Sequence, residues 1–277
     1  MPKPRLIVID IDGTLIDSQS YLRPDVEKAI LRAIDEGVFV TLATGRMISA
    51  AREYIDRLKL RLPVIALNGA IIANSYGGKP LYHEPISIES SVKIVEAIWD
   101  TDSTLIFVCC DKAYARNVSE LTGPALSTWI VNISNFEDID LLGKKKPSTI
   151  LVAGHRDSIE GIQSNTRALN LEDIEDHLFP SIRYFPMHYV EYRARGTNKG
   201  KALKMLREHL GVSRDEVLSI GDHINDISMA EESGIFAAPA SAHQVTRDAA
   251  DYVSPLSNDE GAVAQILDEF YFRIDQK

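Results

Sequence analysis

A short hydrophobic segment near the start of the chain ends in two aspartates, and it constrains the fold more than any other feature. Leu6 to Ile9 is an aliphatic, mostly β-branched run, typical of a strand buried on both faces of a parallel sheet. Asp10 and Asp12 follow where this strand leaves the sheet, the edge at which open α/β sheets bind ligands. Alternate residues of an extended segment point the same way, so both carboxylates can address one point. Gly13 permits a sharp turn that presents backbone N–H groups to an anion.

The same two aspartates predict a metal site. Two carboxylates at one place repel each other unless a cation or a shared proton is present. Mg²⁺ suits them because it prefers hard oxygen ligands and retains waters and substrate phosphate. A calcium loop starting at Asp10 does not fit, since its fifth, sixth and twelfth positions would be Thr14, Leu15 and Tyr21. The spacing alone leaves open that the aspartates are solvated turn residues.

Strands and helices alternate regularly at both ends of the chain, which indicates the fold class. The predicted elements are strands at 6–9, 39–43, 64–67, 217–220 and 235–238, and helices starting at Pro24, Ser49 and Lys199. This alternation is typical of an α/β fold with a doubly wound parallel sheet, a Rossmann-like core. Right-handed crossovers place the carboxyl ends of such strands at one edge of the sheet.

The middle of the chain breaks this alternation. Strand-like runs at 105–110, 129–133, 149–153 and 189–192 mix there with stretches of helical periodicity. Such a mixture predicts a separate α+β domain inserted into the first fold. We therefore expect a core made of residues 1–84 and 193–277, with the inserted domain at 85–192.

Charge and cysteine content indicate which classes of binding partner and which cellular compartment to expect. The formal net charge is −10, from 30 basic and 40 acidic residues, whereas a nucleic-acid partner requires a basic surface. The only two cysteines, Cys109 and Cys110, are adjacent, so a disulfide framework is not expected. No apolar run reaches the ~20 residues that span a bilayer, and the early first strand leaves no room for a signal peptide. We expect a cytoplasmic protein, a monomer or a dimer, without nucleic-acid or membrane partners.

Four polar clusters lie at predicted strand ends or helix starts of the core. They are Asp10 with Asp12, Thr44, Lys199, and the group Asp222, Asn225 and Asp226. Individually some are weak signals, because a lysine at a helix start is usually a solvated charge. The last group is stronger, since helix capping accounts for only one of its three side chains.

In this order the clusters resemble the four motifs of the haloacid dehalogenase-like hydrolase superfamily. Asp10-Ile11-Asp12-Gly13-Thr14-Leu15 is similar to the first motif, and Thr44, Lys199 and Gly221-Asp222…Asn225-Asp226 are similar to the other three. The insert lies between the second and third motifs, and Asn68-Gly69-Ala70 follows the third strand. Both features resemble the Cof-like subgroup, in which an α/β cap domain is inserted at that place.

The resemblance implies a phosphatase with an aspartyl-phosphate intermediate. Asp10 would be the nucleophile, and Asp12 would protonate the leaving alcohol and then deprotonate the attacking water. Mg²⁺ would be held by Asp10, Asp222 and the backbone carbonyl of Asp12. Asp226 would orient Lys199 or a metal-bound water. Phosphate would be bound by the side chains or backbone N–H groups of Ile11, Thr44, Gly45, Lys199 and Asn225.

We therefore predict a Mg²⁺-dependent phosphatase acting on a small phosphorylated metabolite, a sugar phosphate or a phosphorylated cofactor. A phosphotransferase such as a phosphomutase shares the fold and the intermediate, and remains the main alternative. A non-enzymatic phospho-aspartate receiver is disfavoured, because its acidic pair and its phosphorylated aspartate lie on different strands and it carries no large insert. A P-loop is excluded, since Gly196-Thr197-Asn198-Lys199 lacks the required spacing.

Overall fold

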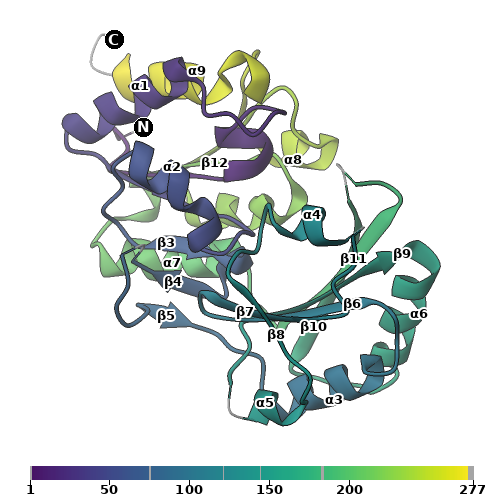
Figure 1. The fold of residues 1–277 in the computed structure, drawn as a ribbon. Helices are drawn as coiled ribbons and strands as arrows, with labels where there is room; N and C mark the ends of the chain where they lie inside the picture. The colour runs from purple at the N-terminus through teal and green to yellow at the C-terminus, as the bar shows by residue number, and fades with distance from the viewer. Residues whose placement is uncertain (1, 75, 121, 144, 182–183, 274–277) are drawn as a thin grey trace. The chain divides into compact units, whose positions relative to one another are not determined.

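The computed structural model describes residues 2–273 apart from 75, 121, 144 and 182–183. The chain folds as two compact units, shown in Figure 1. Unit 1 comprises residues 1–45, 51–81 and 198–277, and unit 2 comprises residues 46–50 and 82–197. The predicted α/β core with an inserted α+β domain is confirmed.

Unit 1 is organised around a five-stranded sheet in the order β14-β13-β12-β1-β2. Its strands are β1 (Leu6–Ile9), β2 (Phe39–Leu42), β12 (Val217–Ile220), β13 (Ile235–Ala238) and β14 (Tyr252–Val253), and all their described pairings are parallel. The strand order reverses at β1, which pairs with β2 on one side and β12 on the other. Ile9 is in register with both Leu42 and Ile220, so three strands end level with one another at the place where ligands bind in such sheets.

Helices connect the strands of unit 1 or follow them along the chain. They are α1 (Pro24–Asp35), α2 (Arg52–Arg57), α7 (Lys199–His209), α8 (Gln244–Ala249) and α9 (Ala262–Leu267). Pro24 begins α1, and the buried face of this helix carries Val26, Ile30 and Ala33. α1 packs against α9, and α7 packs against a 3₁₀ segment, Ile224–Glu232 (Figure 1).

A small hairpin extends unit 1 beyond β2. Strands β3 (Val64–Ala66) and β4 (Ile71–Ala73) pair antiparallel, and Ala43 forms a parallel bridge with Ile65. The connection between the two strands is the tight turn Leu67–Gly69. This bridge brings the end of β2 and that turn together at the edge of the sheet.

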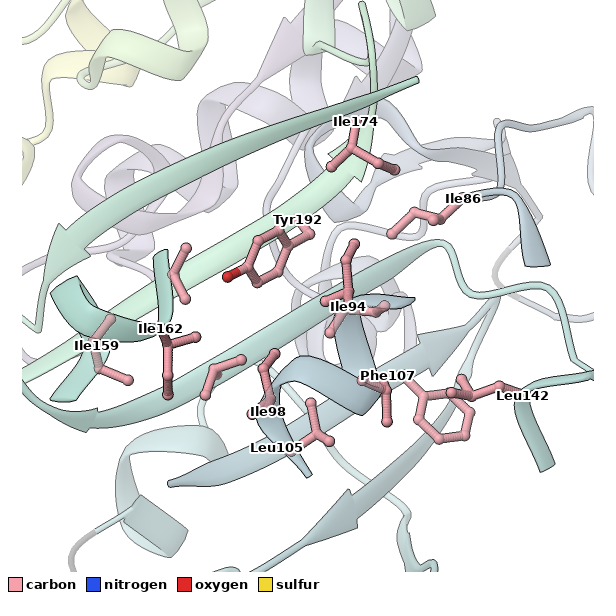
Figure 2. Packing of buried hydrophobic residues seen from close by; sticks show 14 of the residues in the cluster. Ile86, Ile94, Ile98, Leu105, Phe107, Leu142, Ile159, Ile162, Ile174 and Tyr192 are labelled. Carbon is pink, nitrogen blue, oxygen red and sulfur yellow. The ribbon is translucent and has the colours of Figure 1, made fainter. Parts of the chain in front are cut away.

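Unit 2 contains a six-stranded sheet in the order β10-β11-β9-β6-β7-β8. Its strands are β6 (Thr104–Cys109), β7 (Lys112–Arg116), β8 (Ile133–Asn135), β9 (Thr149–His155), β10 (Ile174–Pro180) and β11 (Met187–Ala194), preceded by the short β5 (Tyr82–His83). Its helices are α3 (Ile88–Ile98), α4 (Thr122–Leu126), α5 (Asp140–Gly143) and α6 (Arg156–Arg167). Figure 2 shows the core between helices and sheet, formed by Ile94, Ile98, Ile159, Ile162, Leu105, Phe107 and Tyr192, among others.

The predicted strand at 129–133 is wrong. The N–H of Ile130 donates to the carbonyl of Leu126, which continues the turn after α4, and Asn132 has a left-handed φ of 56°. Trp129 packs its ring against Phe179 and Tyr189. Burial of this apolar run therefore comes from tertiary packing of a turn, and a strand starts only at Ile133.

No helix in the described part of the chain is both long and apolar enough to cross a bilayer.

Candidate active site

The first site residue extends the pairing of β1. The N–H of Asp10 donates to the carbonyl of Ile220 at 2.9 Å, so the backbone of this aspartate is held by β12. The chain then turns tightly through Ile11–Leu15, where Gly13 has a φ of 78°. Ile11 is fully buried. The predicted sharp turn after the aspartate pair is confirmed.

Lys199 is a buried charged group of the site, with 1% of its surface exposed. Its Nζ donates to Oδ1 of Asp10 and to Oδ1 of Asp226, both at 2.6 Å. The residue is the first of α7, and Asn198 caps that helix by accepting from the N–H of Lys201 at 2.8 Å. A helix-start lysine is commonly a solvated charge, whereas this one forms a buried bridge between two carboxylates.

Asp226 ties the loop after β12 to this bridge. While its Oδ1 accepts from Lys199, its Oδ2 accepts from the backbone N–H groups of Asp222 at 3.0 Å and His223 at 2.9 Å. The carboxylate of Asp226 is completely buried. Its position therefore follows from the fold of the loop, and it in turn positions the ammonium group of Lys199.

Three carboxylates converge at the edge of the sheet. Asp10, Asp222 and Asp226 each offer an oxygen, and these oxygens lie within 4.8 Å of one another. Asp222 is held by Thr14, whose Oγ1 donates to Oδ1 at 2.9 Å. Sequence reasoning did not single out Thr14, although it belongs to the segment that resembles the first motif. The carboxylate of Asp12 is not part of this group among the described residues.

The electrostatics of the group favour a bound cation or a shared proton. Burial raises the pKa of the Asp10 carboxyl well above its usual range, and the charge of Asp226 adds to the effect, while Lys199 opposes it. Burial and the charge of Asp226 also raise the pKa of Asp222 to about 7. Burial lowers the pKa of Lys199, but the carboxylates of Asp10 and Asp226 outweigh it and the net shift is upward. One ammonium group does not balance three carboxylates, and an all-oxygen donor set suits a hard divalent ion, so the residues fit Mg²⁺.

The remaining predicted residues lie at neighbouring strand ends of unit 1. Thr44 follows β2 and is completely buried, and its N–H donates to the carbonyl of Ile65 at 2.9 Å. Gly45 comes next in the chain. Asn225 lies in the loop after β12, and its Nδ2 donates to Oδ1 of Asn68 at 2.9 Å. Asn68 belongs to the segment Asn68-Gly69-Ala70, which resembles the Cof-like subgroup. Its position after the third strand is the signal that could have identified it as a site residue.

A family model described as haloacid dehalogenase-like hydrolase matches residues 7–267. The chain is 25% identical over 275 residues to the 5-amino-6-(5-phospho-D-ribitylamino)uracil phosphatase YitU of Bacillus subtilis, covering 97% of this chain and 98% of the relative. It is 24% identical over 280 residues to the pyridoxal phosphate phosphatase YbhA of Escherichia coli, covering 95% and 97%. A crystal structure of a haloacid dehalogenase-like hydrolase from Bacteroides thetaiotaomicron superposes with a TM-score of 0.84 at 24% identity, covering 97% of this chain and 100% of that one.

Proposed function

Because the chain belongs to the haloacid dehalogenase-like hydrolase family, we propose that it is a Mg²⁺-dependent phosphatase with an aspartyl-phosphate intermediate. The observation that carries the proposal is the buried Lys199 bridge between Asp10 and Asp226, beside the carboxylate of Asp222. A buried ammonium next to a cluster of acids at a strand end can bind a phosphoryl group and stabilise its negative charge.

Asp10 is the proposed nucleophile. The contact with Lys199 favours its ionised form and opposes the effect of burial, which favours the neutral form. In the first step the carboxylate forms a bond to phosphorus as the bond to the leaving alcohol breaks. In the second step water attacks phosphorus, releases inorganic phosphate and restores the Asp10 carboxylate.

Asp12 is the proposed general acid and base. It follows Asp10 by two residues, its backbone is extended, with φ −78° and ψ 121°, and its side chain is partly exposed. It would give its proton to the leaving alkoxide in the first step and remove a proton from water in the second. Such proton transfer typically contributes about 10²–10⁴-fold to the rate.

The metal would be held by Asp10, Asp222 and the backbone carbonyl of Asp12. When bound, Mg²⁺ supplies positive charge that offsets the repulsion between an anionic nucleophile and an anionic phosphate ester. Asp226 holds Lys199 in place through its Oδ1 and the loop backbone through its Oδ2. Thr44, Lys199, Asn225 and the backbone N–H groups of Ile11 and Gly45 are the proposed phosphate-binding groups.

The proposed substrate is a small phosphomonoester, a sugar phosphate or a phosphorylated cofactor. Relatives named as phosphatases of 5-amino-6-(5-phospho-D-ribitylamino)uracil and of pyridoxal phosphate match nearly the whole chain, which supports this class. Unit 2 is proposed to act as the cap domain of the enzyme. We also propose that the protein works in the cytoplasm on a freely diffusing metabolite.

The test is phosphate release from p-nitrophenyl phosphate with and without Mg²⁺, comparing wild type with Asp10→Asn. We expect release that requires Mg²⁺ and is lost in Asp10→Asn. Asp35→Asn, which changes an exposed aspartate at the end of α1, is the matched control and should keep full activity. Activity that survives in Asp10→Asn would contradict the assignment of the nucleophile. Lasting phosphorylation of Asp10 in wild type without phosphate release would favour a phosphotransferase.

A further inference from the structure

The turn between β3 and β4 has an unusual backbone. Asn68 adopts the left-handed conformation, with φ 54° and ψ 29°. Apart from glycine, asparagine and aspartate adopt this conformation most readily. The backbone of the turn could thus be formed by a glycine, so the presence of an asparagine side chain calls for another reason.

Asn68 and its neighbour Gly69 contact three segments that carry proposed phosphate-binding groups. The N–H of Asn68 donates to the carbonyl of Thr44 at 3.0 Å. A Cβ on Gly45 would lie 3.2 Å from Oδ1 of Asn68, so the amide sits against the segment after β2. A Cβ on Gly69 would lie 2.2 Å from the carbonyl oxygen of Asn198, so the turn also lies against the start of α7.

The contact with the third segment, the loop after β12, orients the side-chain amide of Asn225. Nδ2 of Asn225 donates to Oδ1 of Asn68 at 2.9 Å. Oδ1 of Asn225 is buried and has no hydrogen-bond partner in the described part of the chain. The bond to Asn68 is therefore the contact that distinguishes the nitrogen of the Asn225 amide from its oxygen.

This orientation decides whether Asn225 attracts or repels an anion. An amide nitrogen carries two N–H groups, so one bond to Asn68 leaves a second N–H to donate. If the amide turned over, its carbonyl oxygen would face the same place and would repel a phosphoryl oxygen. The hydrogen bond that Asn68 accepts thus determines which end of the Asn225 amide, N–H or carbonyl oxygen, is presented to an anion.

We propose that Asn68 is a positioning residue of the phosphate site, which fixes the Asn225 amide with its N–H toward the phosphoryl group. The inference rests on the proposed function, because it assigns to Asn68 the orientation of a group that binds the transferred phosphate. Asn68 acts through Asn225 and touches no substrate itself.

The first variant is Asn68→Gly, which keeps the left-handed backbone and the N–H bond to Thr44 but removes the side chain. We expect the inhibition constant for inorganic phosphate to rise about 10-fold and kcat/KM to fall by a similar factor. A factor of about 10 corresponds to about 1.4 kcal/mol, near the low end of the range for hydrogen bonds to charged groups. Lys59→Gly, at another left-handed and exposed position of unit 1, is the matched control and should change neither quantity.

A double-mutant cycle separates positioning from a structural role. In an Asn225→Ala background there is no amide to orient, so adding Asn68→Gly should change phosphate inhibition by less than about 2-fold. Thermal unfolding of every variant checks that the fold is retained. The inference would be overturned if the effects of the two substitutions on phosphate inhibition multiplied in the double variant. It would also be overturned if Asn68→Gly had the inhibition constant and kcat/KM of wild type.

The two proposals fail in different ways. A wild-type protein that releases no phosphate from any phosphomonoester would contradict the proposed function. Calorimetric titration of inorganic phosphate into the Mg²⁺-loaded wild type and Asn68→Gly proteins still tests the orientation of Asn225. Equal affinity in that titration would overturn the positioning role of Asn68 even if wild type is an active phosphatase.

Discussion

Gly13 and Asp222 are so close that a Cβ on the glycine would lie 2.3 Å from Oδ2 of the aspartate. The two residues are far apart in the sequence and meet because β1 and β12 pair side by side. The tight turn after β1 therefore leaves room for Asp222 only if position 13 has no side chain. This contact links the turn beside the proposed nucleophile to a proposed metal ligand.

Gly13→Ala is expected to abolish most activity while the protein still folds. The added methyl group must displace the Asp222 carboxylate, and a displacement of about 1 Å at a reacting centre can cost about 10²-fold in rate. The left-handed backbone adds about 1–2 kcal/mol of destabilisation. Gly37→Ala is the control, because its φ of 91° carries a similar backbone cost and nothing lies within 4 Å of the added methyl group. Equal kcat/KM for Gly13→Ala and Gly37→Ala would contradict this reasoning.

Lys199→Met is expected to lose both activity and stability. Removing one partner of a buried ion pair leaves uncompensated charges, which typically costs about 3–5 kcal/mol. Here Asp10 and Asp226 would both lose their ammonium partner. Urea unfolding and phosphate release from p-nitrophenyl phosphate are the measurements. Lys201→Met changes an exposed lysine in the same helix. Its unfolding free energy should stay within about 0.5 kcal/mol of wild type, and its rate of phosphate release should be unchanged.

The contribution of His83 to stability should be lost as pH decreases from 7 to 5. Burial, and to a lesser extent the charge of Lys146, lowers the pKa of this histidine below its ordinary value. The unfolded chain then binds more protons, so the contribution is present above about pH 6.5 and is lost as pH falls toward the folded pKa. Compared with wild type, His83→Gln should therefore lose less unfolding free energy, or gain more, between pH 7 and pH 5, measured by urea denaturation. Equal changes for wild type and His83→Gln over this pH range would contradict the reasoning.

Two isoleucines of α3 are expected to contribute differently to the stability of the protein, because they differ in burial. Ile94 of α3 is completely buried in the cluster drawn in Figure 2, whereas Ile88 of the same helix is 40% exposed. Ile94→Ala should destabilise the protein by about 2–5 kcal/mol, because it removes buried methyl groups and leaves a cavity. Ile88→Ala should cost less than about 1 kcal/mol. Similar shifts in the unfolding midpoint for both variants would show that α3 does not pack as the structure has it.

Site residues that follow a strand could be placed from the sequence, because parallel strands end at one edge of a sheet. The strands Leu6–Ile9 and Val217–Ile220 have the limits that their hydrophobic runs predict. Asp10 and Asp222 follow them directly or within two residues. The hydrophobic runs, together with the alternation of strands and helices that indicates a doubly wound sheet, therefore predicted where these carboxylates lie.

Contacts between distant residues could not be predicted in this way. The bond between Asn225 and Asn68 spans 157 positions, and the bond between Thr14 and Asp222 spans 208. Periodicity carries no information on such pairs, since they depend on how α7, the loop after β12 and the turn after β3 pack together. The predicted strand at 129–133 is wrong for a related reason, because ring contacts of Trp129 with two distant strands, β10 and β11, stabilise a turn there.

The pairing of Leu6 with Val217 has a consequence for how the protein is made. During synthesis from the N-terminus, β1 leaves the ribosome long before β12 exists to pair with it. All of unit 2 is translated in that interval, so its sheet can form while unit 1 is still incomplete. Asp10 gains its ammonium partner only after residue 199 has emerged, and the loop that orients that partner emerges later still. The nascent chain can therefore pass through a stage in which unit 2 has folded and the candidate active site has not yet assembled.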